Sequence, residues 1–391
     1  MRVAIVSEYY PRAHDPVLGI WAHRQALAAR DAGADVRVLV LHRPIPPLST
    51  PPRDIARETR RLLVQPHRAA LDGIEVEYAP FVAPPRPGHY GSWGAWAAPS
   101  VALALRRLRR RFPFELLHAH NAVPAADAVL RARIGAPLVV SVHGSDVFHT
   151  ARRFDDGRAA VARAFGAARL VLANSAGVEA ASRALGARHT RVVHLGTDLP
   201  PAPADAAGRE PPVLVTIAHL IARKRHADVL RAIALRGDRR PALRYLVIGD
   251  GPERDALERL AGELGLRARV EFAGQLAPAV ALRRAREASV FVMPSVDEAF
   301  GVAYVEAMAA GLPAIGARGE PGPEEIAAAG RGIRLVPAGD IDALAREIDA
   351  LVGNRAALRA AGADARSTVA AAFTWERCGR ATVRAYEDAL R

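Results

Sequence analysis

Several kinds of residue and segment are scarce in this chain of 391 residues, and each scarcity excludes a class of structure. Cys378 is the only cysteine, so the sequence excludes an internal disulfide and a cysteine metal cluster. No apolar run reaches the roughly 18–20 residues that cross a bilayer. The first residues indicate a strand and a turn, without the apolar core and cleavage site of a signal peptide. We therefore expect a globular, cytoplasmic protein.

Lysine is as scarce as cysteine, since Lys224 is the only one in the chain. The net charge is +13, and nearly all of the positive charges are arginines. The one dense basic run consists of Arg106, Arg107, Arg109, Arg110 and Arg111. No aromatic residues interleave with this run and no nucleic-acid-binding signature accompanies it, so we expect no nucleic acid partner. We interpret the run as a solvated helix face, with peripheral contact to an anionic membrane as the alternative.

Apolar strand-like segments alternate with helix-like segments along the chain, which is the pattern of parallel sheets covered on both faces. The first series of predicted strands comprises 3–7, 36–41, 74–78, 115–118, 137–142, 170–173 and 192–195. The second series comprises 213–218, 245–248, 270–272, 290–293, 314–315 and 333–336. Residues 44–99, rich in proline and arginine, yield only the strand at 74–78.

The two series indicate an α/β protein of two Rossmann-like domains, 1–198 and 213–374, that face a cleft. The Pro/Ala-rich stretch 199–212 lacks apolar periodicity and is interpreted as a linker. One long helix, 375–391, ends the chain. Because ligands of such sheets lie outside the carboxyl ends of the strands, we searched those loops for functional residues.

The segment 293–316, MPSVDEAFGVAYVEAMAAGLPAIG, forms a predicted strand–loop–helix–strand unit. The helix begins beside Gly301, where free backbone N–H groups would make an anion site. Glu298 precedes the helix, and Glu306 lies one to two turns into it, where a carboxylate can accept the hydroxyls of a ribose. The pattern predicts a phosphate-bearing ligand, with an ordinary repeated βα unit as the alternative.

Other loops at strand ends carry further candidates. Lys224 and its neighbour Arg223 would hold a diphosphate, or form an exposed basic turn. The sequence Gly249-Asp250-Gly251 lacks the spacing of a dinucleotide fingerprint, so a tight turn explains it as well as ligand contact.

Three histidines and an aspartate lie at strand ends in the first domain. His143 would donate to a sugar hydroxyl or remain hydrogen-bonded in the interior. We expect His118 and His120 to face opposite sides of their strand and to be structural or acceptor-side, and we place Asp146 on the acceptor side too. No set of side chains at ligand spacing joins them, so we expect no metal site.

Glu298, seven intervening residues and Glu306, within DEAFGVAYVEAMAAGLPAI, resemble the EX7E motif of the retaining glycosyltransferases of family 4 (group 1). Further segments resemble that family in order along the whole chain: PVLGIWAHRQALAARDAGADVRVLV, SVHGSDV, VVHLGTDL, TIAHLIARKRHADVLRAI, VIGDGPERDALERLA and FTWERCGRATVRAYEDAL. The resemblance implies a GT-B fold whose C-terminal helix returns to the first domain.

The resemblance also implies roles for individual residues. Glu306 would bind the ribose and Glu298 the hexose hydroxyls of a nucleotide sugar, while Lys224 would neutralise its diphosphate. His143 would contact the donor sugar near its reacting side. The remaining donor-binding positions implied are Gly19, His219, Arg223, Gly249, Gly251, Ala299, Phe300, Gly301 and Val302.

The chain departs from the family pattern in two places. His219 stands where the family often has the phosphate-binding arginine, and it is at most partly charged near neutral pH. Gly19 is a single glycine where many relatives have two.

The function implied is transfer of a hexose from a nucleoside diphosphate sugar to an acceptor hydroxyl with retained configuration, without a metal or cofactor. We expect a carbohydrate or lipid-linked acceptor in bacterial envelope polysaccharide or glycolipid synthesis, with the protein cytoplasmic or peripheral on the inner face of the membrane. A non-catalytic nucleotide-sugar binding protein and a nucleotide-sugar epimerase of the same fold are the alternatives.

Overall fold

The computed structural model describes the whole chain except residues 49, 87 and 238–241. It divides into two compact units, each with its own sheet. Unit 1 comprises residues 1–195 together with 375–391, and unit 2 comprises 196–374. The stretch 199–212 belongs to unit 2, where the N–H of Ala204 donates to the carbonyl of Ala310 at 2.7 Å.

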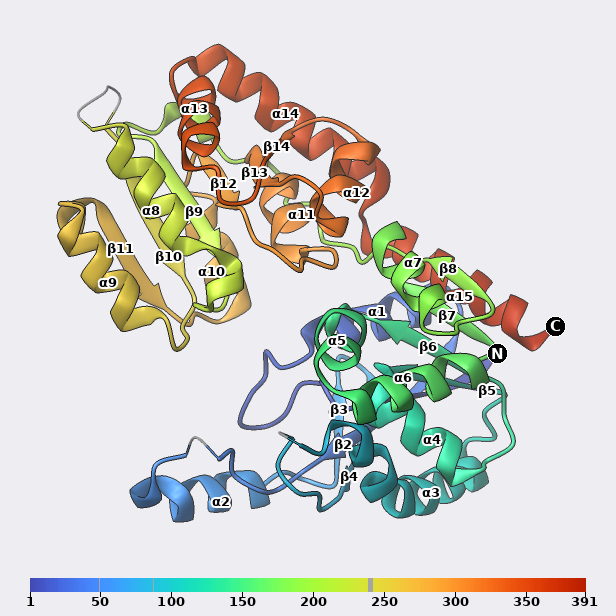
Figure 1. Cartoon of the computed structure of the whole chain (residues 1–391). Helices are drawn as coiled ribbons and strands as arrows, with labels where there is room; N and C mark the ends of the chain where they lie inside the picture. Colours follow the sequence, from blue (N-terminus) through green and yellow to red (C-terminus); the bar gives the residue numbers. More distant parts are fainter. Residues whose placement is uncertain (49, 87, 238–241) are drawn as a thin grey trace. The chain divides into compact units, whose positions relative to one another are not determined.

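Unit 1 is built on an eight-stranded sheet with the order β3-β4-β2-β1-β5-β6-β7-β8 (Figure 1). Its strands are β1 (Arg2–Ser7), β2 (Asp35–His42), β3 (Arg68–Leu71), β4 (Ile74–Pro80), β5 (Leu116–His120), β6 (Leu138–Val142), β7 (Leu170–Ala173) and β8 (Thr190–Val192). Its helices are α1 (Ile20–Asp31), α2 (Ile55–Leu63), α3 (Trp93–Arg111), α4 (Asp127–Ala132), α5 (Ala151–Arg153), α6 (Asp155–Ala167), α7 (Ala176–Ala184) and α15 (Trp375–Leu390). All paired strands run parallel except β3, which lies antiparallel to β4 at the edge of the sheet.

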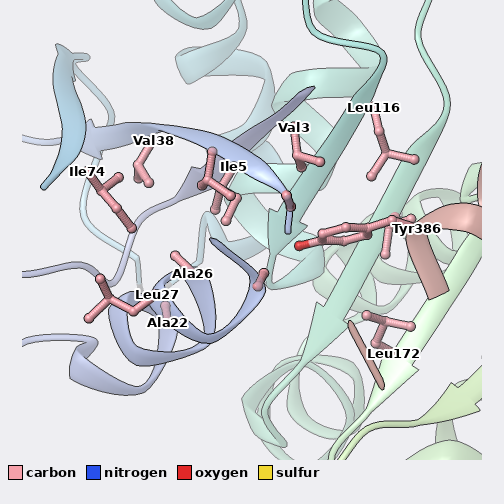
Figure 2. Close-up of a cluster of buried hydrophobic side chains, with 14 of the residues drawn as sticks. Val3, Ile5, Ala22, Ala26, Leu27, Val38, Ile74, Leu116, Leu172 and Tyr386 are labelled. Carbon is pink, nitrogen blue, oxygen red and sulfur yellow. The ribbon is translucent and has the colours of Figure 1, made fainter. Parts of the chain in front are cut away.

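The core of unit 1 lies where β1, β2 and β5 meet α1 and α15 (Figure 2). Val3 and Ile5 of β1 pack in one cluster with Ala26 of α1 and Tyr386 of α15. The alternate residues of β1 are also fully buried, so the sheet is covered on both faces as parallel sheets are. Helix α15 therefore belongs to the core of unit 1, and the predicted return of the C-terminal helix is confirmed.

The region 44–99 contains more regular structure than its sequence indicates. It holds α2, β3 and the first two turns of α3, which begins at Trp93 although Pro99 lies inside it. Two arginines of the basic run at the end of α3 are held by unit 1 itself. Arg109 donates to the carbonyl of Ile134, and Arg111 forms an ion pair with Glu77.

Unit 2 is built on a six-stranded parallel sheet with the order β11-β10-β9-β12-β13-β14 (Figure 1). Its strands are β9 (Val213–Ile217), β10 (Arg244–Ile248), β11 (Val270–Gly274), β12 (Val290–Met293), β13 (Ala314–Ala317) and β14 (Ile333–Val336). Its helices are α8 (His226–Leu235), α9 (Arg254–Glu263), α10 (Pro278–Ala285), α11 (Val302–Ala309), α12 (Pro321–Ala329), α13 (Ile341–Val352) and α14 (Arg355–Ala372). Leu214, Val290 and Val292 are fully buried at its centre.

In each sheet the strand order reverses at one point, between β1 and β5 in unit 1 and between β9 and β12 in unit 2. The loops leaving two such strands run to opposite sides of the sheet and leave a crevice at their carboxyl ends, where ligands of doubly wound sheets bind. The two-domain α/β prediction is confirmed, and the two reversal points direct the search for a site. None of the helices in the described part of the chain combines the length and the apolar character that crossing a membrane requires.

Candidate active site

An ion pair joins the two loops at the reversal point of unit 2. Lys224 ends the short 3-10 turn Ala222–Lys224 after β9, and Glu298 lies in the loop after β12. The Lys224 Nζ and Glu298 Oε2 atoms are 2.5 Å apart, and the two side chains are only 12% and 9% exposed. The structure therefore brings together the sole lysine and the first glutamate of the EX7E pattern.

The surroundings of Glu298 keep its carboxylate charged. Burial opposes the charged form, but the Lys224 ammonium, Arg223 and a hydrogen bond from Ser295 outweigh it, and the pKa of Glu298 lies below its ordinary value. Ser295 Oγ is 3.0 Å from Glu298 Oε2, and Arg223 Nη1 is 4.0 Å from the same oxygen. The ammonium of Lys224 has three N–H donors, and one partner leaves it able to bind a ligand anion as well.

The turn before α11 leaves backbone donors beside this ion pair. Gly301 has φ 80°, which a side chain would strain, and a Cβ there would lie 2.5 Å from the ring of Tyr304. Glu298 Cγ lies against the same position. The N–H groups of Gly301 and Val302 find no acceptor among the described residues. Donors at the start of a helix attract anions, so this turn and Lys224 form an anion cradle.

Glu320 supports the same loop and was missed by sequence reasoning. Its Oε2 atom accepts the N–H of Glu298 at 2.9 Å, and burial with the nearby Asp297 and Glu298 raises its pKa. The N–H of Gly322 donates to the carbonyl of Glu298 at 2.9 Å. No local pattern links Glu320 to Glu298 across 22 residues, because their contact depends on how α12 begins beside the loop.

The other candidates of unit 2 lie around this cradle in different environments. Glu306 is half-buried on α11, whereas Ala299 and Phe300 are buried. His219 is exposed, and its ring forms a hydrogen bond in which the Nδ1 atom lies 2.9 Å from the carbonyl oxygen of Asp250. The histidine that replaces the family's arginine is thus engaged with the loop after β10.

Gly249 and Gly251 lie where the neighbouring backbone leaves no room for a side chain. A Cβ at Gly249 would lie 2.0 Å from the carbonyl oxygen of Ala218, and one at Gly251 would lie 2.5 Å from that of Leu220. The loops after β9 and β10 therefore approach each other too closely for a side chain. This explains both glycines without a ligand, while ligand contact by them stays a prediction.

In unit 1 the histidines gather at the carboxyl ends of β5 and β6. The expectation that His118 and His120 face opposite sides of the strand was wrong: residues two apart in a strand share a face. Their rings lie 4.5 Å apart. His118 is fully hydrogen-bonded, to Tyr386 Oη and Ser141 Oγ at 2.7 Å each, so it supports the packing of α15.

His143 and His120 form a stacked pair at this end of the sheet. His120 Nδ1 lies 2.9 Å from His143 Nε2. Burial lowers the pKa of His143 to about 4 and that of His120 well below its ordinary value, so both rings are neutral near pH 7. His143 Nδ1 and His120 Nε2 are buried and have no hydrogen-bond partner among the described residues, so the hydrogen-bonding capacity of both atoms is unsatisfied.

Gly19 begins α1 next to this pair. Its φ is 63°, and a Cβ there would lie 2.1 Å from the backbone of Tyr9, so only glycine fits the turn. Trp21, two residues later, packs edge-on against His143 with ring centroids 5.9 Å apart. The structure therefore brings the glycine turn and the histidine pair together.

Asp146 lies behind the pair as a buried carboxyl. Asn121 Nδ2 donates to Asp146 Oδ2 at 3.0 Å. Burial raises the pKa of Asp146 to about 6, although hydrogen bonds from Asn121 and from the N–H groups of Ala122 and Val123 oppose the rise. Asn121 was missed by sequence reasoning. Within the described residues, no group of three or more histidine, cysteine, aspartate or glutamate side chains is placed to hold a metal ion.

Two family models match the chain, one to each unit. Residues 18–200 match "Glycosyltransferase Family 4", and residues 204–368 match "Glycosyl transferases group 1". The chain is 31% identical over 324 residues to the D-inositol 3-phosphate glycosyltransferase of Nocardia farcinica, covering 75% of this chain and 71% of that protein.

Two further similarities extend over most of the chain. It is 27% identical over 305 residues to a GDP-mannose-dependent alpha-(1-6)-phosphatidylinositol monomannoside mannosyltransferase of Mycobacterium tuberculosis, covering 71% of this chain and 77% of that protein. Among solved structures, Anabaena HepE in complex with UDP and glucose matches with a TM-score of 0.73 and 21% identity, over 99% of each chain. The last similarity shows the GT-B fold.

Proposed function

This chain belongs to the glycosyltransferases of family 4 (group 1), and we propose that it transfers a hexose from a nucleoside diphosphate sugar to an acceptor hydroxyl with retention of configuration. The observation that carries the proposal is the Lys224–Glu298 pair beside the N–H groups of Gly301 and Val302, for which the described part of the chain offers no acceptor. It places a cation, a carboxylate and an anion cradle at the reversal point of one sheet.

Lys224 and the start of α11 are proposed to bind the diphosphate. The ammonium and the N–H groups of Gly301 and Val302 would stabilise the negative charge that grows on the diphosphate as the sugar leaves. Arg223, 42% exposed beside the pair, would add to this field and compensate for the histidine at 219. Lys224 would thereby supply charge stabilisation that a metal ion supplies in other transferases, which is our basis for proposing a metal-independent reaction.

The two glutamates of the EX7E pattern are proposed to bind different parts of the donor. Glu298, kept charged and held by Ser295, would accept hydrogen bonds from hexose hydroxyls. Glu306, on α11, would accept those of the ribose. Glu298 would bind the sugar without becoming a covalent nucleophile, because Lys224 and Ser295 both engage its Oε2 atom and so reduce the nucleophilicity of that oxygen.

The reaction proposed proceeds on one face of the sugar. The bond between the anomeric carbon and the diphosphate oxygen breaks, the acceptor oxygen bonds to the same carbon on the same face, and the acceptor proton passes to the departing diphosphate. His143, neutral and with Nδ1 unpartnered, would hydrogen-bond the donor sugar near that carbon. His120 and Asp146 would lie on the acceptor side.

The relatives suggest the chemical setting. The name of the Nocardia protein includes D-inositol 3-phosphate, that of the Mycobacterium protein includes GDP-mannose and phosphatidylinositol monomannoside, and HepE was solved with UDP and glucose. We accordingly propose a carbohydrate or lipid-linked acceptor in bacterial envelope polysaccharide or glycolipid synthesis. UDP-, GDP- and ADP-sugars are the donors to be compared.

A thermal-shift screen of UDP-, GDP- and ADP-sugars tests the donor first, since a ligand that binds only the folded state raises its melting temperature. We expect one base to protect the protein, and Glu306→Gln and Lys224→Met to weaken that protection at least tenfold in apparent affinity. The matched control is Arg231→Met, an exposed arginine of the same unit.

Turnover distinguishes a transferase from the alternatives. Free nucleoside diphosphate should appear in step with an acceptor, the product should keep the anomeric configuration of the donor by NMR, and EDTA should leave the rate unchanged. Donor binding without turnover would indicate a binding protein. A new epimeric nucleotide sugar formed without acceptor would indicate an epimerase.

A further inference from the structure

Helix α2 carries exposed apolar and basic side chains together. Four of the ten large apolar side chains that are exposed in the described part of the chain lie between residues 48 and 64. Ile55, Leu63 and Val64 are 47%, 65% and 65% exposed. Helix α3 also combines arginines with exposed apolar side chains, Trp96 and Leu103, so the combination alone does not distinguish α2. The exposed apolar residues of α2 are denser, because Ile55, Leu63 and Val64 fall within residues 55–64.

The two kinds of side chain form adjacent strips along the helix. Ile55 and Leu63 lie on one side, eight residues apart, at the spacing of a helix face. Arg57 and Arg60 lie three residues apart on the neighbouring side, and Arg53 lies in the 3-10 turn Pro52–Asp54 that precedes the helix. Leu62 is the one residue of the helix that is buried. The helix therefore turns an apolar strip and a basic strip toward solvent.

The acidic groups of this segment do not cancel its charge. Asp54 pairs with Arg53 and Arg57, and Glu58 pairs with Arg61, but both carboxylates are turned inward and are only 22% and 23% exposed. Arg60 forms no ion pair with any described residue. The arginines of the segment outnumber its carboxylates, and the arginines are the groups at the surface.

Helix α2 is anchored to unit 1, near the carboxyl ends of β1 and β2. His42, the last residue of β2, has its Nε2 atom 3.0 Å from the carbonyl of Leu62. Arg61 donates to the carbonyl of His14 at 2.7 Å, in the loop that follows β1 and leads to Gly19. The basic run of α3, in contrast, ends just before β5 begins, at the opposite edge of the sheet.

We propose that α2 is a membrane-docking surface that lies in the headgroup region of an anionic lipid bilayer. Ile55, Leu63 and Val64 would enter the boundary between headgroups and acyl chains, and Arg53, Arg57 and Arg60 would contact lipid phosphates. This differs from the alternative raised by the sequence, which assigned membrane contact to residues 106–111 of α3. Lipid binding through α2 needs no donor, no acceptor and no turnover, so it can be tested independently of the proposed transfer.

Vesicle co-sedimentation of the full chain tests the proposal. We expect binding to vesicles of equal parts phosphatidylcholine and phosphatidylglycerol, little binding to phosphatidylcholine alone, and a decrease with added salt. R53A/R57A/R60A should lose about fivefold in partitioning per arginine. Its matched control, R106A/R107A/R110A, removes the same charge from α3 and should bind like the unaltered protein.

The apolar strip is tested separately by Leu63→Ser with Val64→Ser, which should lower partitioning about tenfold or more. Leu235→Ser, at a leucine of unit 2 that is 53% exposed, is the control. Intact thermal melting and unchanged protection by a nucleotide sugar would show that the variants fold, and would separate this result from the outcome for transfer.

Three results would overturn the proposal. Equal losses in the α2 and α3 arginine variants would mean general electrostatic attraction. Loss only in the α3 variant would return the contact to 106–111. A change from dimer to monomer on L63S/V64S, without vesicle binding by the unaltered protein, would make α2 an interface between copies of this chain.

Discussion

Lys224 and Glu298 depend on each other for their charge. Both side chains are almost out of solvent, where a single charge is far less stable than a pair. Glu298 stays ionised because the lysine outweighs its burial. Lys224, which we propose binds the diphosphate, thus also stabilises the loop of Glu298, which we propose binds the sugar.

Removing one partner should therefore cost more than removing both. We expect Lys224→Met to lower the free energy of unfolding of unit 2 by about 3 kcal/mol, because it leaves a buried carboxylate alone. Adding Glu298→Gln to it should restore part of this loss, since a neutral amide needs no counter-ion. Urea unfolding followed by circular dichroism measures both. Equal costs for the single and double variants would show that the pair is solvated and weakly coupled.

The histidines of unit 1 predict a pH dependence with a definite sign. Burial holds the pKa of His143 at about 4 and that of His118 at about 3, below the value of about 6.5 in an unfolded chain. Their contribution to stability is present above pH 6.5 and is lost as the pH falls toward their folded values. Asp146, with its raised pKa, changes in the opposite direction and offsets part of the loss.

Between pH 7 and pH 5 the stability of unit 1 should fall, by on the order of 2 kcal/mol for each buried histidine. His143→Gln should reduce this fall by about that amount. His67→Gln, at an exposed histidine of the same unit, should leave it unchanged. Urea unfolding at a series of pH values provides the measurement, and an unaltered fall in His143→Gln would contradict the assigned burial.

At the scale of elements, the turn into α11 is the feature on which the proposed donor binding depends. Its shape requires a positive φ at Gly301 and the ring of Tyr304 directly beneath it. The hydroxyl of Tyr304 reaches the carbonyl of Met293 at the end of β12. Strand, turn and helix are thereby fixed to one another around the unpartnered N–H groups.

Gly301 and Gly319 have the same φ of 80°, so comparing their alanine variants separates the cost of backbone strain from the cost of a steric clash. Gly319 has no atom within 4 Å of an added Cβ, whereas Gly301 has Tyr304 at 2.5 Å. Gly319→Ala should cost only the strain of the left-handed region, about 1 kcal/mol. Gly301→Ala should cost more and should also abolish the protection given by the nucleotide sugar in thermal melting. Undiminished protection in Gly301→Ala would remove this turn from the donor site.

The sequence predicts the elements better than it predicts their contacts. The alternation of apolar strands and helices suffices for both sheets and for the turn between Glu298 and Glu306. It does not reveal α2 or β3, because their residues are largely exposed and lack a strong apolar pattern. Glu320 and Asn121 are unpredictable for another reason: each acts through a partner more than 20 residues away, and only the packing of the elements brings them there.

At the scale of the molecule, the two units can be observed separately. The four tryptophans, at 21, 93, 96 and 375, all belong to unit 1. Tryptophan fluorescence therefore reports the unfolding of unit 1, while circular dichroism reports both units. Helix α15 enters unit 1 from the far end of the chain and packs on α1, where Gly379 lies against Ala28.

A pair of glycines in two helices of unit 1 tests this packing. A Cβ at Gly379 would lie 2.1 Å from the carbonyl of Ala28, whereas one at Gly166 would meet its nearest atom at 3.8 Å. Gly379→Ala should lower the free energy of unfolding of unit 1 by about 2 kcal/mol through overpacking. Gly166→Ala should stabilise unit 1 slightly through its better helix propensity. Fluorescence-detected urea unfolding compares them, and equal effects would show that α15 tolerates displacement.

The discontinuity of unit 1 also bears on how the protein is made. A ribosome releases residues 1–195 long before 375–391, and between them it produces the whole of unit 2. During that time the apolar surface that Tyr386 and Cys378 later cover remains open to water and to other nascent chains. Unit 2, continuous in sequence, can complete its fold first. Unit 1 begins to be synthesised first but is completed last, so its apolar surface is exposed longer than that of unit 2.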